Sequence, residues 1–174
     1  MREAGSVKLR PAGCPRHLDF HPSGKFAYLA EEYSNHVVVL ACNPQTGGAV
    51  PIQRLPTEPD CFMGLYAKAS EIKVHPSGRF LYVSNRGSNS IAVYGINQET
   101  GLLTPQGWTG CNGEVPRFFM LGRTGKYLLC GNQKSHQISV FSINQDTGAL
   151  SLEKEIKDIS CPAWMLLSED EKQG

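Results

Sequence analysis

The sequence has little that would mark a membrane, secreted or nucleic-acid-binding protein. No run among the 174 residues approaches the length of a membrane span, and residues 1–10 lack the apolar core of a secretory signal. The formal net charge is only +1, so no basic surface for nucleic acid or anionic lipid is indicated. An apolar fraction of 40% argues against a disordered chain. We therefore expect a folded, cytoplasmic protein with no nucleic-acid or membrane partner.

Metal-binding spacings and helical patterns are also missing. The six cysteines form no C-x-x-C pair and no zinc spacing, so the sequence predicts no metal site. A repeat core of this size needs no disulfide staples, and we expect free thiols in a reducing compartment. No segment has the apolar spacing of a long amphipathic helix. These absences leave an all-β fold without a metal or other cofactor as the expectation.

What the sequence does contain is a threefold repeat. The stretch 69–101 has an earlier copy at 15–47 and a later copy at 115–148. The glycines of a first turn are spaced 54 and 47 residues apart, and the glycines of a second turn repeat both intervals. These residues are Gly24, Gly78 and Gly125 for the first turn, and Gly47, Gly101 and Gly148 for the second. A period of this size is typical of propeller blades or helical arrays.

Short β-rich runs within each copy favour the propeller. FAYLA, FLYVS and YLLC follow the first turn, and HVVVL, SIAVYGI and QISVFSI come next, separated by Asn, Ser and Gly. Such runs are typical of strands joined by hairpins. We predict three four-stranded blades at about 14–60, 68–110 and 114–157, and a terminal strand at 159–167 that begins a fourth.

All 174 residues then form a single partial β-propeller, roughly half of a ring. Residues 1–13 are interpreted as the outer strand of a blade whose beginning is missing. An open half ring exposes blade faces, so we expect either self-association or a missing N-terminal half that closes the circle.

Residues at the same repeat position lie at the same height around one axis, and this brings two polar sets together. Eight and seven residues before the first-turn glycine lie Arg16, Ser70 and Arg117, followed by His17, Glu71 and Phe118. Seven and eight residues after it lie Glu31, Asn85 and Asn132, followed by Glu32, Arg86 and Gln133. Both sets flank strand ends away from the turn, so we expect them to meet at one mouth of the channel. A propeller core needs none of these groups, and the set therefore indicates a functional site.

Other recurring polar residues have a simpler explanation. His21 and His75 recur at the same H-P-S-G turn and are better explained by turn formation or packing than by chemistry. His36 and His136 are expected at turn tips. The recurring Asn residues are common formers of tight turns.

The segments PRHLDFHPSGKFAYLAEE, ASEIKVHPSGRFLYVSNRGSNSIAVY and PRFF with the following TGKYLLCGNQ resemble the lactonase family of seven-bladed propellers. That family includes the bacterial type of 6-phosphogluconolactonase and the fungal carboxy-muconate cyclases. The resemblance covers about 8–167 and matches the C-terminal half of the family, whose members are about twice as long.

The resemblance implies site residues. Candidate catalytic residues are His17, Glu71, Arg86 and Arg117. Glu32 also matches a polar position common in the family and is a candidate substrate-binding residue. Shared repeat position, not the resemblance, adds the other candidate substrate-binding residues, Arg16, Asn85, Asn132 and Gln133. The chain departs from the family where A-E-E stands in place of the more usual Asn-Glu pair.

Three functions remain open on this basis. A hydrolase that opens a sugar-phosphate lactone needs a base for water and a group that stabilises the oxyanion. His17 or Glu71 could be the base, with histidine favoured because imidazole changes charge near neutrality, and Arg86 and Arg117 could bind phosphate or polarise the carbonyl. The same groups would suit a carboxy-muconate lactonising cyclase. The third hypothesis is a catalytically silent propeller that serves as an interaction module.

Overall fold

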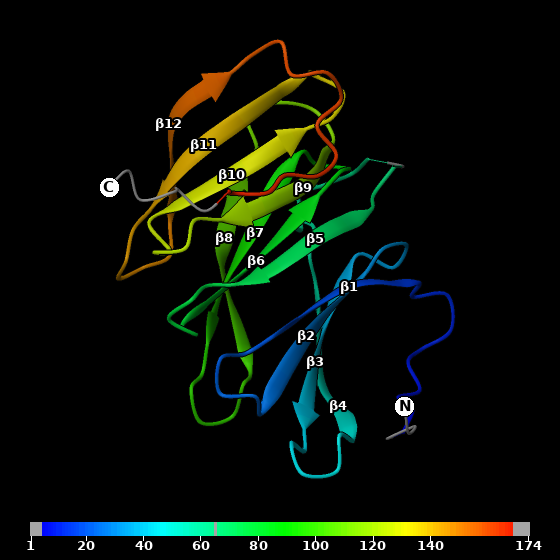
Figure 1. The fold of residues 1–174 in the computed structure, drawn as a ribbon. Coiled ribbons are helices and arrows are strands. Elements are labelled where there is room, and N and C mark those ends of the chain that lie inside the picture. The colour runs from blue at the N-terminus through cyan, green and yellow to red at the C-terminus, as the bar shows by residue number, and fades with distance from the viewer. Residues whose placement is uncertain (1–4, 65, 169–174) are drawn as a thin grey trace.

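The computed structural model describes residues 5–64 and 66–168, and its regular structure consists of three antiparallel sheets (Figure 1). The first sheet contains β1 (Pro15–Phe20), β2 (Phe26–Glu31), β3 (His36–Cys42) and β4 (Ala49–Pro56). The second contains β5 (Ala69–Val74), β6 (Phe80–Asn85), β7 (Ser90–Ile96) and β8 (Leu103–Gly110). The third contains β9 (Pro116–Leu121), β10 (Tyr127–Asn132), β11 (Gln137–Ile143) and β12 (Leu150–Ile156). Over these described residues, no helix is long and apolar enough to cross a membrane.

Each sheet is one blade, with its four strands paired in chain order. The strands of each sheet fall within one of the three predicted repeats, and the predicted all-β architecture of three four-stranded blades is confirmed. The inner strands β1, β5 and β9 contact one another in sequence, so the blades fan out from a shared inner row (Figure 1).

The turns follow from the repeated glycines. Gly24, Gly78 and Gly125 have φ between 69° and 74°, in the left-handed region that strains residues with a Cβ atom. The second-turn glycines have nearly the same φ, 71° to 72°. The repeated spacing of glycine along the chain therefore indicates two turns per blade that need this conformation.

The H-P-S-G histidines join neighbouring blades. His21 Nε2 lies 3.1 Å from the carbonyl oxygen of Gly78, and His75 Nε2 lies 2.8 Å from that of Gly125. Each contact links the first turn of one blade to the first turn of the next. In the third blade Gly122 occupies the histidine position, so that blade has no equivalent donor. The histidines are packing residues, as the sequence suggested.

Buried tyrosines make a second link at the same junctions. Tyr28 donates its hydroxyl to the carbonyl of Gly101 at 3.0 Å, and Tyr82 donates to that of Gly148 at 2.9 Å. Both tyrosine side chains are fully buried. The third blade has Leu129 at this position.

Apolar residues fill the space between the blades. One buried cluster joins the first two blades through residues such as Val39, Ile72 and Tyr94. A second joins the last two blades through Tyr82 and Phe119, among others. The core therefore lies between sheets, which fixes the inner strands relative to one another.

Two predicted strands are not formed. Residues 5–13 contain no strand, and residues 1–4 of that predicted segment lie outside the described residues. The terminal strand expected at 159–167 is likewise absent. The reason is the lack of a pairing partner: in the described part of the chain no strand follows that could form a ladder with it. The segment still sits beside the third blade, where Cys161 N donates to His136 Nδ1 at 3.2 Å.

Candidate functional site

The inner strands carry irregularities where the polar residues lie. The register of β1 against β2 shifts between Pro15 and His17, and the register of β9 against β10 shifts where Arg117 lies. The pairing of β5 with β6 shifts between Ala69 and Ile72. A bulge of this kind re-aims side chains that would otherwise alternate between the two faces of the sheet, and bulges are common next to active sites. It lets consecutive residues of one strand reach the same region.

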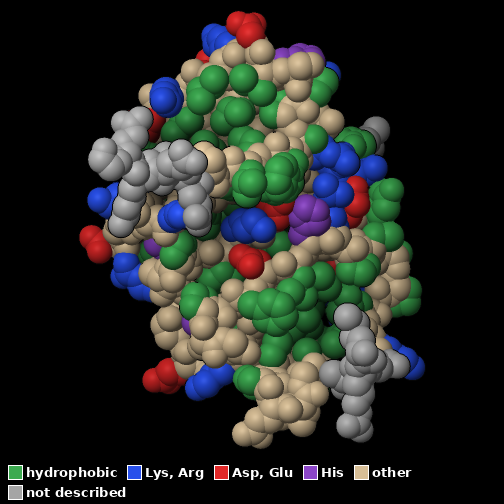
Figure 2. All heavy atoms as spheres, in the orientation of Figure 1, with side chains coloured by type: hydrophobic (Ala, Val, Ile, Leu, Met, Phe, Trp, Pro, Cys, Tyr) green, Lys and Arg blue, Asp and Glu red, His purple; other side chains and the backbone are tan. Residues whose placement is uncertain are grey.

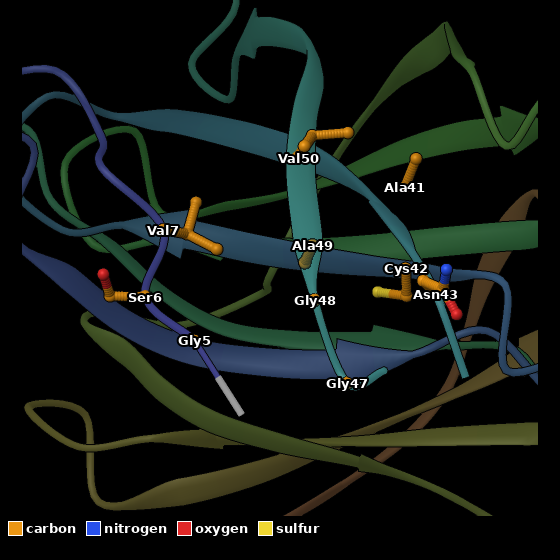
Figure 3. Close-up of a pocket in the computed structure, with 10 residues that line it drawn as sticks. All are labelled: Gly5, Ser6, Val7, Ala41, Cys42, Asn43, Gly47, Gly48, Ala49 and Val50. Carbon is orange, nitrogen blue, oxygen red and sulfur yellow. The ribbon is translucent and has the colours of Figure 1, made fainter. Parts of the chain in front are cut away.

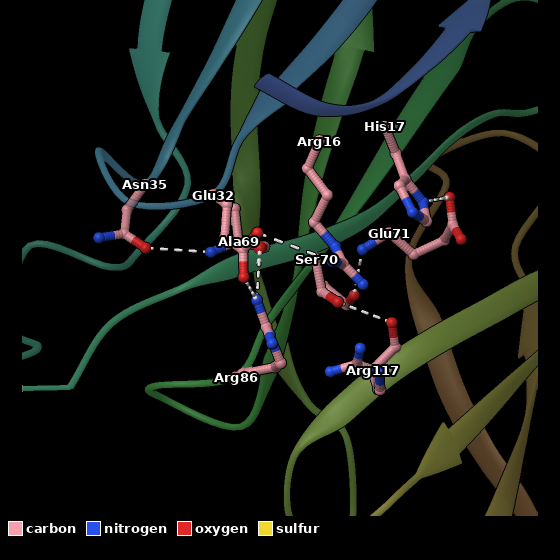
Figure 4. Close-up of polar contacts among 10 residues, drawn as sticks. Arg16, His17, Glu32, Asn35, Ala69, Ser70, Glu71, Arg86 and Arg117 are labelled. Atoms are coloured by element: carbon pink, nitrogen blue, oxygen red, sulfur yellow. Dashed lines mark hydrogen bonds and ion pairs between the residues drawn. The ribbon is translucent and has the colours of Figure 1, made fainter. Parts of the chain in front are cut away.

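His17 and Glu71 form a pair between the first two blades. His17 Nδ1 lies 2.8 Å from Glu71 Oε1, and Figure 4 shows the two side chains facing each other from β1 and β5. The Glu71 side chain is 1% exposed, whereas that of His17 is 36% exposed. The carboxylate is therefore enclosed, and the imidazole reaches the surface.

Three donors surround the Glu71 carboxylate. Besides His17, the amide of Ile72 donates to Oε1 at 3.0 Å, and Lys73 Nζ lies 3.5 Å from the same oxygen. Burial alone would raise the pKa of Glu71, but the hydrogen bond from His17 and the charge of Lys73 outweigh burial and lower that pKa. Glu71 is therefore ionised at neutral pH and can only accept hydrogen bonds. It follows that His17 Nδ1 carries the proton of this contact, and in the neutral imidazole the lone pair then lies on Nε2.

Glu32 joins two arginines at the ends of β1 and β6. Its Oε1 lies 2.5 Å from Arg86, and its Oε2 lies 3.7 Å from Arg16. Burial would raise the pKa of Glu32, but the hydrogen bond and charge of Arg86, together with the charge of Arg16, lower it. Arg86 is itself buried and also approaches the carbonyl of Ala69 at 3.4 Å.

Arg117 is the third guanidinium of the group. Its backbone carbonyl accepts a hydrogen bond from the Ser70 hydroxyl at 2.6 Å, which ties β9 to β5 (Figure 4). Among the described residues its side chain has no hydrogen-bonding partner. Burial and the positive charges of Arg86 and Arg117 lower the pKa of Arg16, against the opposing charges of Glu32 and Glu71.

We call Arg16, His17, Glu32, Glu71, Arg86 and Arg117 the polar cluster. The structure thus brings together the four predicted catalytic residues and two of the predicted substrate-binding residues. Figure 2 shows a band on this face in which His, acidic and basic side chains lie together between hydrophobic ones.

The other three predicted substrate-binding residues lie outside the polar cluster. Asn85 donates to the carbonyl of Thr57 at 2.5 Å, and Asn132 donates to that of Cys111 at 3.1 Å. Both amides are fully buried and hold the connection that enters their blade. Gln133 is half-buried, and within the described part of the chain its hydrogen bond is that of the backbone amide to the carbonyl of Val115.

The strand alternation explains this separation. Asn85 and Asn132 are the last residues of β6 and β10, and successive strand residues point to opposite faces. Glu31 has the same place in β2, and it is fully buried against Arg54 at 2.9 Å. The same alternation could have revealed Lys73, two residues after Glu71, which the sequence reasoning missed.

One cavity lies on the first blade and holds little that could act chemically. This cavity, of about 460 Å³, lies where β3 ends and β4 begins, between residues such as Val7, Cys42 and Ala49 (Figure 3). Its one titratable group is Cys42, and burial raises the pKa of that thiol. No three His, Cys, Asp or Glu side chains in the described ranges gather closely enough to hold a metal ion.

Comparison with known proteins places the chain in a family. The family profile described as "Lactonase, 7-bladed beta-propeller" matches residues 1–167. The 6-phosphogluconolactonase of Bacillus subtilis is 40% identical over 124 residues, which cover 71% of this chain and 35% of that protein.

Solved structures agree with the fold. A putative 6-phosphogluconolactonase from Bacteroides fragilis superposes with a TM-score of 0.81 at 32% identity, covering 90% of this chain and 42% of that one. A periplasmic gluconolactonase from Pseudomonas aeruginosa gives a TM-score of 0.81 at 30% identity, covering 87% and 42%. The chain thus spans less than half the length of these relatives. It belongs to the lactonase family of seven-bladed β-propellers.

Proposed function

We propose that this chain contributes the hydrolytic site of a lactonase that opens a sugar-phosphate lactone, with His17 as the base. The observation that carries the proposal is the His17–Glu71 pair, in which a buried, ionised carboxylate fixes the imidazole tautomer. The names of the Bacillus subtilis and Bacteroides fragilis relatives support the substrate class. Glu71 is a poor candidate for the base because its oxygen is already occupied by three donors.

The reaction follows from the free nitrogen of His17. Nε2 takes a proton from a water molecule, and the resulting hydroxide attacks the lactone carbonyl carbon. A neighbouring guanidinium stabilises the oxyanion. The tetrahedral intermediate collapses with cleavage of the ring C–O bond, and the leaving alkoxide takes the proton back from His17. The product is the open-chain acid, and Glu71 stays ionised throughout as the partner of the imidazolium.

The charge balance of the site favours an anionic substrate. Arg16, Arg86, Arg117 and Lys73 provide four cationic side chains, whereas Glu32 and Glu71 provide two carboxylates. An excess of two positive charges matches the charge of a phosphate monoester. Arg117 is the best placed to bind it, because Arg86 is already paired with Glu32.

The test is hydrolysis of 6-phosphogluconolactone above the spontaneous rate. His17→Ala and Glu71→Gln should remove the excess rate, and Arg117→Gln should raise KM for the phosphorylated lactone about 10- to 100-fold, the worth of a charged hydrogen bond. Unphosphorylated gluconolactone should be much less affected by Arg117→Gln. His36→Ala is the matched control, since this histidine lies on the same blade outside the polar cluster.

The assay also separates the competing functions. Conversion of a carboxy-muconate in place of the lactone would replace the proposal with the cyclase. No excess rate on either compound, with the fold intact, would leave the interaction module.

A further inference from the structure

The terminal segment continues the repeat register even though it forms no strand. Val115 and Cys161, which precede Pro116 and Pro162, both have positive φ, 59° and 45°. Val115 N donates to the side chain of Asn89. Cys161 N donates to the side chain of His136, which has the same repeat position as Asn89. The segment therefore enters beside the third blade as β9 enters beside the second. Trp164 then has the repeat position of Phe118.

The rings of Phe118 and Trp164 lie against each other at the repeat position at which His17 and Glu71 pair between the first two blades. Their ring centroids lie 6.3 Å apart with the planes tilted by 45°. The Ser70–Arg117 hydrogen bond ties β5 to β9 directly beside this position. The same repeat position therefore holds a polar pair, His17 and Glu71, at the first junction and an aromatic pair, Phe118 and Trp164, beyond the third blade.

The exposure of these two rings is unequal. Phe118 is 9% exposed and belongs to none of the buried core clusters, whereas Trp164 is 66% exposed. The indole N–H has no hydrogen-bonding partner among the residues that the structure describes. An exposed indole ring whose N–H has no partner suits a ligand that offers both an apolar face and hydroxyl groups.

We propose that Trp164, supported from behind by the buried Phe118 ring, forms an aromatic wall that binds the C–H face of the sugar while the arginines hold its phosphate. This inference rests on the proposed function and adds a specificity-determining contact to it. Inorganic phosphate has no apolar face that could stack on the wall, whereas the sugar ring of a sugar phosphate has one. The wall therefore distinguishes a sugar-phosphate ligand from any other anion that the arginines attract.

Tryptophan fluorescence tests this directly, because the chain contains only two tryptophans. Trp108 lies on β8 of the second blade, where its Nε1 donates to the carbonyl of Thr57 at 2.7 Å. In Trp108→Phe the emission reports Trp164 alone. Titration with 6-phosphogluconate should change that emission saturably, and titration with inorganic phosphate should not. An emission unchanged by 6-phosphogluconate at concentrations that calorimetry shows to be saturating would overturn the inference.

Binding to the otherwise unaltered chain gives a second readout. Trp164→Ala should weaken 6-phosphogluconate binding about tenfold, equivalent to about 1.4 kcal/mol, without changing inorganic phosphate binding. Trp164→Phe should retain most of the affinity. Leu166→Ala, an exposed residue of the same segment, is the control and should bind as the parent does.

The outcomes separate this inference from the proposed function. If Trp164→Ala hydrolyses the lactone with unchanged KM and binds 6-phosphogluconate normally, the wall is refuted and the hydrolase stands. If the chain binds 6-phosphogluconate through Trp164 but shows no excess hydrolysis, the wall stands and the hydrolase is refuted. If the chain does not bind 6-phosphogluconate at all, the wall is refuted whatever the hydrolysis assay shows.

Discussion

Removing the Tyr82 hydroxyl should destabilise the junction between the second and third blades. Tyr82 is fully buried, and its hydroxyl donates to the buried carbonyl of Gly148 at 2.9 Å. No other described group donates to that carbonyl. Tyr82→Phe keeps the ring packing and leaves the carbonyl without a partner, which costs about 1–3 kcal/mol. A loss of about 2 kcal/mol lowers Tm by about 4–8 °C for a domain of this size.

Urea denaturation followed by circular dichroism measures this loss, and the chain supplies its own controls. Tyr28→Phe breaks the equivalent bond to Gly101 at the first junction and should cost a similar amount. The two losses should add in the double variant, because they share no partner. Tyr127→Phe alters an exposed tyrosine of the third blade and should stay within about 0.5 kcal/mol of the parent. A Tyr82→Phe loss no larger than that of Tyr127→Phe would refute the junction argument.

Two further predictions concern the turns and the acidic residues. Gly78→Ala should destabilise the fold more than Gly24→Ala, by at least about 1 kcal/mol. Both glycines have positive φ, but only at Gly78 would the new Cβ atom meet a side chain, at 2.6 Å from His21 Nε2. Equal losses in a denaturant titration would contradict this. The pKa values of Glu32 and Glu71 are lowered in the folded state. Each carboxylate therefore stabilises the fold above the unfolded-state pKa of about 4.3. This stability is lost as the pH falls through the folded-state pKa. Tm should therefore drop below about pH 4, and the Tm difference between the parent and Glu71→Gln should shrink there; a constant difference would argue against the ionised pair.

The blades could be predicted from the sequence because glycine reports backbone conformation directly. Both turn positions need positive φ, and glycine adopts it without strain, so the spacing of Gly24, Gly78 and Gly125 records the repeat. The terminal segment shows the limit of this approach. Its sequence keeps the register, as the Cys161–His136 hydrogen bond shows, but a strand also needs a partner, and the described residues provide none.

Repeat position predicted which residues meet, but it did not predict which way each side chain points. His17 and Glu71 were placed together correctly because they occupy the same position in neighbouring blades. Asn85 and Arg86 were treated alike, although strand geometry sends one into the blade junction and the other into the polar cluster. The side chains of the neighbouring residues Arg16 and His17 both reach the polar cluster because the register of β1 shifts at this point. A bulge leaves no dependable mark in a single sequence.

The contacts between blades also suggest a requirement for any surface that would close the ring. Within the chain, each junction sets a histidine and a tyrosine of one blade against two glycine carbonyls of the next. A second copy packed end to end would instead set Gly122 and Leu129 against Gly24 and Gly47, so no side chain would donate. We propose that the face of the first blade fits a blade that carries both donors, as the first two blades do. The polar cluster is built entirely from residues on or next to β1, β2, β5, β6 and β9, so its internal contacts do not depend on that closure.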